Sequence, residues 1–222
     1  MGIDLVQLES QLKRSRIWNH FGGRASRLYY EALRNALVGC QSLLDAGCGV
    51  RPNIGQVLGI RRNYLCDTHL ASLVEAKKDG RGIAFAADVK ALPIKPNSVD
   101  AVLLLQVLEH LEKDDGLKLL CTLEQVARRV IIVSTPNGYV RQDALEGNLN
   151  QVHQSGWDVD ELRSLGYLVM GYEGFKLFKI PGTSVCRCPS AFFTYCTRFG
   201  LFSGILRRFP ALAFQLIAVK HL

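Results

Sequence analysis

Three aspartates stand in or directly after short apolar segments, at places where their carboxylates could bind a ligand together. Asp45 lies in LLDAGCG, Asp67 ends YLCD, and Asp88 lies in AADV. A single aspartate in such a position is more often a helix cap or a turn residue. Three in succession, the first beside a Gly-x-Gly turn, are hard to explain by capping alone. Carboxylates placed this way suit a ligand with a cationic group, the hydroxyls of a ribose and an amino group on a ring.

A second group of reactive side chains lies in the polar stretch from Pro136 to Trp157. A loop of this length is unusual in a compact domain unless it binds something. Its histidine, His153, could serve as a general base because imidazole titrates near neutrality, or it could bond to the backbone and only shape the loop. We expect substrate contacts from this loop and from the histidine after the preceding apolar run: Asn137, Tyr139, Asn150, Trp157 and His110.

The elements that must position these residues alternate between short apolar runs and longer amphipathic stretches. The runs are bounded by Gly, Asp, Asn or Pro, which is typical of buried parallel strands. Such alternation predicts an α/β fold with a doubly wound, mostly parallel sheet and helices on both sides. The expected strands are Ser42–Ala46, Tyr64–Cys66, Ile83–Ala86, Ala101–Leu105 and Val130–Ser134, and the expected helices are Pro52–Leu58, Leu70–Lys78 and Asp114–Arg128.

The two ends of the chain are expected to complete a single domain of 222 residues with seven strands. The last strand should pair with the strand that precedes it in sequence, so the segment between them becomes an insertion. The expected parts are a helical cover in residues 1–40, a core in 41–174, an insertion in 175–212 and a last strand in 213–222. The cover should contain helices near 4–16 and 24–38. The core should end with a helix at Trp157–Leu165 and a strand at Tyr167–Tyr172, and the last strand should be Ala213–Val219.

The net charge of +7, from 27 Lys and Arg against 20 Asp and Glu, is unevenly distributed. Residues 41–174 carry fourteen basic and seventeen acidic side chains, whereas residues 175–222 carry seven basic and no acidic ones. A mildly acidic core offers no surface that would follow a phosphate backbone. We therefore expect any anionic partner to meet the chain through its last part.

The composition also excludes several classes of protein. An apolar content of 48% is too high for a disordered chain, and the longest stretch without a charged residue has 11 residues, whereas a spanning helix needs about 20. Acidic residues near the N-terminus argue against secretion, and seven scattered cysteines suit a reducing, cytoplasmic setting. No metal is expected, because Cys186, Cys188 and Cys196 lack the paired spacing and the fourth ligand of a zinc site.

The insertion in 175–212 interleaves aromatic and basic side chains. A helix from Ala191 to Arg208 would have a wide apolar face with Arg198 and Arg207 near its rim, as in an interfacial helix on an anionic bilayer. Bases stacked on aromatics beside cations give a rival interpretation, and a substrate-binding lid gives the simplest one. We expect a lid, a contact with the inner membrane face, or both, and we do not expect nucleic acid.

Over roughly residues 40–172 the sequence resembles the class I S-adenosylmethionine-dependent methyltransferases, in their small-molecule and lipid-type branch. LLDAGCG resembles their first motif, YLCD the second, and AADVKALPIKPNSVDAVLLLQVLEHL the run through the adenine-binding acid, the fourth strand and the next helix. The chain departs from many relatives at Arg51, where they have a glycine. The resemblance implies that Asp45, Gly47, Cys48 and Gly49 contact the methionine part of S-adenosyl-L-methionine, Asp67 its ribose, Asp88 and Val89 its adenine, and the backbone carbonyl of Gln106 its amino group.

The resemblance further implies transfer of a methyl group to a small acceptor, which we expect to be lipidic or glycan-linked and to be methylated at oxygen. An RNA methyltransferase is the rival among enzymes, and a non-catalytic scaffold that keeps the fold is the rival outside them. LQVL follows the fourth strand where amino-methylating nucleic-acid enzymes place NPPY or DPPY. A nicotinamide dehydrogenase is disfavoured, because the Gly-x-Gly-x-x-Gly spacing fails at Pro52.

Overall fold

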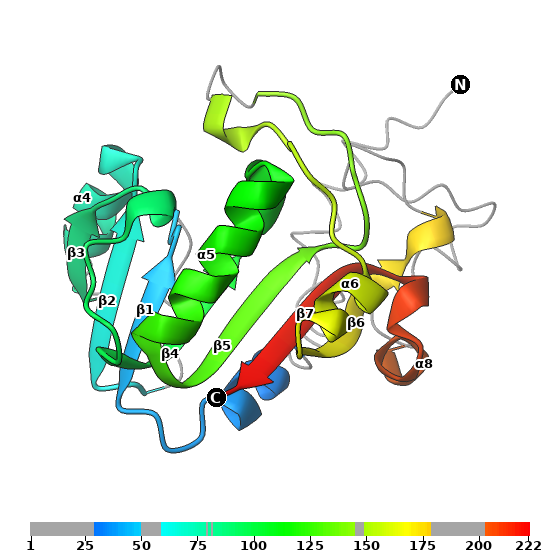
Figure 1. Cartoon of the computed structure of the whole chain (residues 1–222), viewed down its shortest axis with the longest axis horizontal. Helices are drawn as coiled ribbons and strands as arrows, with labels where there is room; N and C mark the ends of the chain where they lie inside the picture. The colour runs from blue at the N-terminus through cyan, green and yellow to red at the C-terminus, as the bar shows by residue number, and fades with distance from the viewer. Residues whose placement is uncertain (1–28, 50–58, 79, 81, 145–148, 179–202) are drawn as a thin grey trace, which may run out of the picture.

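The computed structural model describes residues 29–49, 59–78, 80, 82–144, 149–178 and 203–222 (Figure 1). Several predictions from the sequence lie outside these residues. They are the first helix at 4–16, the start of the second helix at 24–38, the helix Pro52–Leu58 with Arg51 before it, and most of the insertion with its three cysteines.

The described residues form one seven-stranded sheet in the order β3-β2-β1-β4-β5-β7-β6. All neighbouring pairs are parallel except those of β7, which runs antiparallel to both β5 and β6. The predicted α/β fold class is therefore confirmed. The strands are β1 (Ser42–Ala46), β2 (Arg62–Asp67), β3 (Ile83–Ala86), β4 (Val99–Leu105), β5 (Ala127–Pro136), β6 (Leu168–Phe175) and β7 (Ala213–His221).

The central strands are apolar on both faces because helices cover both faces. Val102, Leu104 and Ile131 point to the face packed by α5, whereas Leu103 and Ile132 point to the face packed by Leu33 and its neighbours. Successive side chains of a strand point to opposite faces, so a strand covered twice has to be apolar throughout. In Figure 1 helix α5 lies across β4 and β5.

The helices follow the predicted pattern with differences in length; the predicted helix Trp157–Leu165, for example, is shortened to Val159–Ser164. The described part of the second N-terminal helix is helical over residues 29–36. Helix α5 ends at Val126, two residues before the predicted end at Arg128, because Ala127 already begins β5. The α-helices are α4 (Leu70–Lys78), α5 (Lys113–Val126), α6 (Val159–Ser164) and α8 (Ser203–Arg208), and the 3-10 turns are η1 (Val89–Ala91), η2 (Leu108–His110), η3 (Leu149–Gln151), η4 (Lys176–Phe178) and η5 (Pro210–Leu212). Among the described residues, no helix has the length and apolar character needed to cross a membrane.

One carboxylate joins three strands at the amino ends of β1 and β4. Asp100 Oδ2 accepts hydrogen bonds from the backbone N–H groups of Gln41 and Ser42, and Asp100 Oδ1 accepts one from Arg128 Nε. Burial raises the pKa of Asp100, but these donors favour the charged form more strongly, so the pKa lies below its ordinary value. The interaction fixes the relative positions of β1, β4 and β5 at the edge opposite the candidate site.

We predict that Asp100→Asn lowers the free energy of unfolding by about 1.5–3 kcal/mol at pH 7, the range for hydrogen bonds to a charged group. A lowered pKa in the folded state means that this stabilisation is present above the ordinary aspartate pKa of 3.8 and is lost as the pH falls below it. Urea unfolding from pH 7 to pH 3 should show the two proteins converging at the acidic end. Asp143→Asn, at an exposed ion pair with Arg141, is the control and should change stability by less than about 0.5 kcal/mol; an equal loss in both variants would contradict the assignment.

Candidate functional site

The carboxyl ends of β1, β2 and β4 meet at one edge of the sheet and bring the predicted cofactor residues together. Asp45 lies in β1 beside Leu65 of β2 and Leu103 of β4 and is buried. The turn after β1 is tied to β2, since Gly47 N and Cys48 N both donate to the carbonyl oxygen of Cys66. In an open parallel sheet, ligands bind at this kind of edge.

Asp67 lies at the rim of this edge with its carboxylate held by two backbone donors. Gly49 N donates to Oδ2 at 2.8 Å, and His69 N donates to Oδ1 at 2.8 Å. Each carboxylate oxygen has a second lone pair, so the half-buried group can still accept a pair of ligand hydroxyls. The contact with Gly49 links the second predicted motif directly to the first.

The two glycines of the turn are required for different reasons. Gly47 has φ +73°, and a Cβ on it would lie 2.5 Å from Val107 Cγ2, in the loop after β4. Gly49 has φ +55°, but a Cβ on it would meet no atom of the described residues, which exclude 50–58, within 4 Å. Gly47 therefore lets two loops approach each other closely, while Gly49 borders open space that a ligand could fill.

The remaining predicted cofactor residues follow the carboxyl ends of β3 and β4, at the same edge of the sheet. Asp88 is exposed and caps η1 by accepting a hydrogen bond from Lys90 N, and Val89 beside it is buried. Gln106, at the tip of β4, has φ +57°, a strained conformation for a residue other than glycine. Its side chain donates to Ser134 Oγ and to Gln215 Oε1, which holds the strained backbone in place.

Cys48 lies in the turn but is not suited to nucleophilic chemistry. Burial, and then the nearby carboxylate of Asp45, raise the pKa of its thiol to about 12. A thiol needs a lowered pKa to react as a thiolate near neutrality. Cys48 therefore contributes its backbone and its bulk to the turn.

The loop after β5 folds back onto the loop after β4 and is fastened there. The backbone N–H groups of Gln154 and Ser155 both donate to the carbonyl oxygen of Glu109, and Gly138 N donates to Trp157 O. Near the other end of the site, Asn150 Nδ2 lies 3.5 Å from Thr68 Oγ1, in the loop after β2. The loop therefore runs from the end of β4 to the end of β2 along the site edge.

Two of the residues predicted to contact substrate instead hold this loop. Trp157 is fully buried, and its indole N–H donates to Ser155 Oγ. Asn137 is buried and donates to the carbonyl oxygens of Pro210, Ala211 and Ala213. Both side chains are buried in this structure, and Asn137 satisfies backbone carbonyl groups that would otherwise be orphaned. Tyr139 and Asn150 are exposed on the same loop.

His153 and His110 meet although 43 positions separate them. Their rings lie edge to face with centroids 4.8 Å apart, and Glu109 lies beside them. The ligand atoms of the three side chains all lie within 4.8 Å of one another. We refer to Glu109, His110 and His153 as the Glu-His-His cluster; Glu109, which with His110 forms a stretch expected from the sequence to lie near the acceptor, is buried.

Both imidazoles of the cluster are expected to be neutral near pH 7. Burial lowers the pKa of His110 and of His153, more strongly than the hydrogen bonds to backbone carbonyls raise it. His110 Nδ1 contacts Val152 O at 3.2 Å, and His153 Nδ1 contacts Val140 O at 2.6 Å. A carbonyl oxygen only accepts, so Nδ1 carries the proton and Nε2 keeps its lone pair in both rings.

Lys113 is a supporting residue that sequence patterns did not reveal. Its ammonium lies 3.6 Å from the centroid of the Trp157 ring, donates to Gly156 O at 2.6 Å and pairs with Glu161 Oε2 at 2.6 Å. It thus joins α5, α6 and the end of the site loop. A lysine in the first turn of a helix opposes the helix dipole, and that unfavourable position is the one signal in the sequence that could have singled it out.

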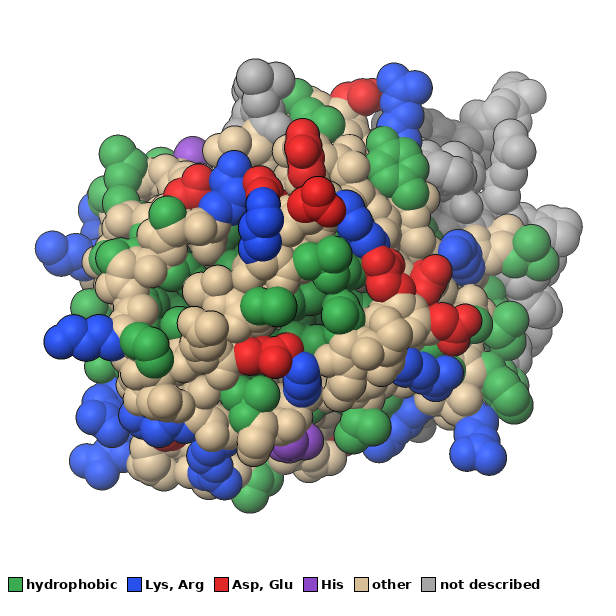
Figure 2. All heavy atoms as spheres, in the orientation of Figure 1, with side chains coloured by type: hydrophobic (Ala, Val, Ile, Leu, Met, Phe, Trp, Pro, Cys, Tyr) green, Lys and Arg blue, Asp and Glu red, His purple; other side chains and the backbone are tan. Residues whose placement is uncertain are grey.

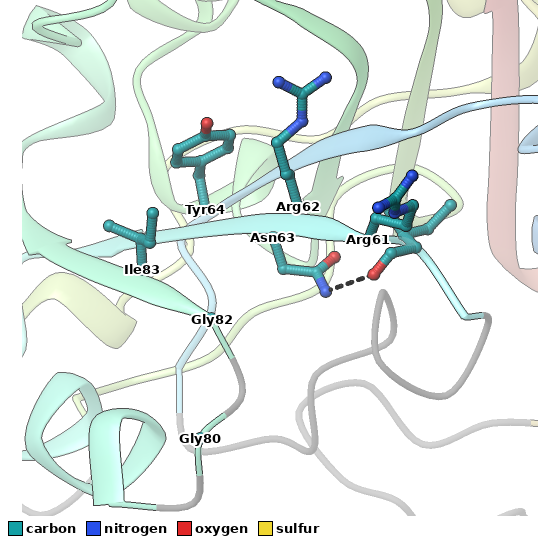
Figure 3. Close-up of a pocket in the computed structure, with 8 residues that line it drawn as sticks. Arg61, Arg62, Asn63, Tyr64, Gly80, Gly82 and Ile83 are labelled. Atoms are coloured by element: carbon teal, nitrogen blue, oxygen red, sulfur yellow. Dashed lines mark hydrogen bonds between the residues drawn. The ribbon is translucent and has the colours of Figure 1, made fainter.

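A separate cavity of about 350 Å³ lies at the opposite edge of the sheet, by the amino ends of β2 and β3. Figure 2 shows basic side chains at the edge of the molecule where β3 and α4 lie. In Figure 3, Arg62 and Tyr64 lie on one side of β2, whereas Asn63 lies on the other and donates to Ile60 O. None of the residues predicted for cofactor or substrate lines this cavity.

We predict that Gly47→Ala lowers the free energy of unfolding by at least about 2 kcal/mol, from the left-handed backbone and the collision with Val107. Gly49→Ala meets only the backbone cost and should lose about 1 kcal/mol. Chemical unfolding of both variants measures the difference. The double variant Gly47→Ala, Val107→Ala should recover part of the loss; a double variant no more stable than Gly47→Ala would contradict the close approach of the two loops.

Comparisons with known proteins agree with this arrangement. The methyltransferase-domain family model matches residues 44–133, from β1 to β5. A crystal structure of an S-adenosylmethionine-dependent methyltransferase from Archaeoglobus fulgidus is similar over 99% of this chain and 100% of that one, with a TM-score of 0.55 and 16% identity. One from Mesorhizobium loti is similar over 91% of this chain and 100% of that one, with a TM-score of 0.56 and 15% identity.

No curated protein sequence is significantly similar to this chain. The solved structures, at this level of identity, establish the fold, and the family model covers the glycine turn, the three aspartates and the start of the Glu-His-His cluster. The open space at Gly49, the carboxylate of Asp67 and the buried carboxylate of Asp45 fit a cationic nucleoside ligand. The chain therefore contains a methyltransferase domain and has the fold of the S-adenosylmethionine-dependent methyltransferases.

Proposed function

We propose that this methyltransferase methylates a hydroxyl oxygen of a small lipidic or glycan-linked acceptor. The observation that carries this proposal is the place of the Glu-His-His cluster. Val107 packs against Gly47 of the cofactor turn, and the cluster begins two residues later at Glu109. A hydroxyl lying between the cluster and the turn would be beside groups able to activate it.

The cofactor residues take the roles implied by the family resemblance. Asp67 accepts hydrogen bonds from the ribose hydroxyls, and Asp88 and Val89 lie at the adenine. Asp45 and the turn from Gly47 to Gly49 face the methionine part, and Gln106 directs its backbone carbonyl to the amino group. The strained backbone of Gln106 supports this role, because such strain persists where the surrounding structure imposes it for function.

Methyl transfer depends more on the alignment of the acceptor atom with the methyl group than on acid–base catalysis. When bound, S-adenosylmethionine supplies an electrophilic methyl group on a sulfonium. The acceptor oxygen gives a lone pair to the methyl carbon and loses its proton, while the electron pair of the broken C–S bond stays on sulfur as a neutral thioether. A hydroxyl holds its proton tightly at pH 7, so this acceptor needs an activating group as well as positioning.

His153 is the residue we propose to be essential for that activation. Its Nδ1 is committed to Val140 O, so Nε2 is left to act on the acceptor side of the ring. His110 lies against it from the loop after β4. Tyr139 and Asn150, which are exposed on the site loop, are the substrate contacts that the geometry leaves accessible.

A lipidic acceptor is supported by the surface that adjoins the site loop. Asn137 fastens this loop to Pro210–Leu212, directly after α8. Around α8 the apolar side chains of Ile205, Phe209 and Leu212 are exposed beside Arg207 and Arg208. Figure 2 shows hydrophobic and basic side chains together at the end of the molecule where α8 lies. Apolar groups edged with arginines suit an anionic bilayer, where a lipid acceptor would be met.

We predict that Asp67→Asn weakens binding of S-adenosylhomocysteine at least tenfold, because an amide donor replaces an acceptor at the ribose. Isothermal titration calorimetry of wild type and variant measures it. Asp160→Asn changes an exposed carboxylate on α6 and should leave the affinity within twofold. Equal affinities in wild type and Asp67→Asn would contradict the pocket.

The acceptor class is tested with methyl-labelled S-adenosylmethionine, offered with a total lipid extract or with total RNA. We expect the label in the lipid fraction, and we expect His153→Ala to lower its incorporation at least tenfold while the affinity for S-adenosylhomocysteine stays within twofold. His221→Ala, an exposed histidine at the end of β7, should behave as wild type. Label in RNA alone would contradict the proposed acceptor, and unchanged incorporation by His153→Ala would contradict its role.

A further inference from the structure

We propose that the Glu-His-His cluster binds one divalent transition-metal cation through Glu109, His110 and His153. The three residues come from two loops, at the end of β4 and after β5, and converge at the site edge of the sheet. Two imidazoles and one carboxylate are a ligand set that suits first-row cations such as Zn²⁺, Co²⁺ and Mn²⁺. No metal was expected from the sequence on the basis of Cys186, Cys188 and Cys196, which lie outside the described residues; the ligands proposed here are of a different kind.

The protonation pattern of the two histidines is the one that metal binding requires. Each ring directs Nδ1 at a backbone carbonyl, of Val152 for His110 and of Val140 for His153. Each Nε2 therefore carries a lone pair. Metal-ligating histidines nearly always donate their other ring N–H to a carbonyl or a carboxylate, which fixes the orientation of the ring.

The backbone around the cluster is held before any ligand arrives. Glu109 O accepts from Gln154 N at 2.8 Å and from Ser155 N at 3.1 Å, and His153 N donates to Gln142 O at 3.1 Å. His110 O accepts from Gln154 Nε2 at 2.7 Å. The two loops are thus joined on both sides of the cluster, so the three ligands are positioned by hydrogen bonds that do not use their ligating atoms.

The distances allow a cation with small side-chain rotations. Bonds of about 2.1 Å in a tetrahedral site place neighbouring ligand atoms about 3.4 Å apart. The ligand atoms of the cluster lie within 4.8 Å of one another. Three protein ligands leave at least one coordination position open, which is the arrangement of catalytic rather than structural sites.

This inference deepens the proposed function and rests on it for its role. A cation at the cluster would orient the acceptor hydroxyl and lower its pKa, so that the hydroxyl proton passes to solvent water. His153 would then activate the acceptor as a ligand of the cation and not by taking the proton itself. The binding site, in contrast, is inferred from the geometry alone. It can be tested without a methyl acceptor.

The test is titration of the full chain with Co²⁺, followed by absorption spectroscopy. We expect one equivalent to bind and to give d–d bands without the thiolate-to-cobalt charge-transfer band that cysteine ligands would produce. Zn²⁺ should displace it, and Mg²⁺, which prefers oxygen ligands, should not. Glu109→Gln and His153→Ala should each weaken Co²⁺ binding at least tenfold, and His221→Ala should leave it unchanged.

Two further measurements make the result decisive. Each variant is checked for an unchanged affinity for S-adenosylhomocysteine, which shows that the domain is folded, and His110→Asn provides a third, smaller change. Three results would overturn the inference: no Co²⁺ binding to the wild type, Co²⁺ binding that is unchanged in all three variants, or a thiolate-to-cobalt charge-transfer band. If the metal binds as expected but no labelled methyl reaches a lipid hydroxyl, the proposed acceptor fails while the metal site stands.

Discussion

The close approach of Gly47 to Val107 is the contact on which the candidate site depends. It brings the turn after β1 against the loop after β4, and it exists only because position 47 has no side chain. The cofactor turn is thereby fixed relative to Glu109 and His110, which follow Val107. Because β1 and β4 are parallel neighbours, their carboxyl ends already lie together. The absence of a side chain at Gly47 then allows the loops after these two strands to contact each other.

The second constraint is the fastening of the loop after β5. Its residues would not reach the site edge if they were held only by their ends. Glu109 O captures its backbone at Gln154 and Ser155, while Trp157 is buried beneath Lys113. The burial of the Trp157 side chain thus helps to position a polar loop. The contacts that place His153 beside His110 do not involve the Nε2 atom of either ring.

The sequence predicted the sheet better than the site. The strand Ser42–Ala46 has the predicted bounds, since a strand buried on both faces is continuously apolar and ends at turn residues. Ile83–Ala86 also has the predicted bounds, although it is a partly exposed edge strand. Asp67 could be placed because it ends a strand. The meeting of His110 and His153 was not predicted, because a contact across 43 positions has no local signal. Asn137 and Trp157 were predicted to contact substrate for a different reason. An amide or an indole that stabilises a loop cannot be told by residue type from one that binds a ligand.

We propose that the edge formed by β1, β2 and β4 binds S-adenosylmethionine with its sulfur toward the Glu-His-His cluster. A crystal structure of the complex with S-adenosylhomocysteine tests it most directly. We expect the ribose hydroxyls to lie within hydrogen-bond distance of Asp67 and the sulfur to face the gap between Gly47 and His153. A ligand bound elsewhere, such as the cavity beside Asn63, or one whose sulfur points away from the cluster, would contradict it.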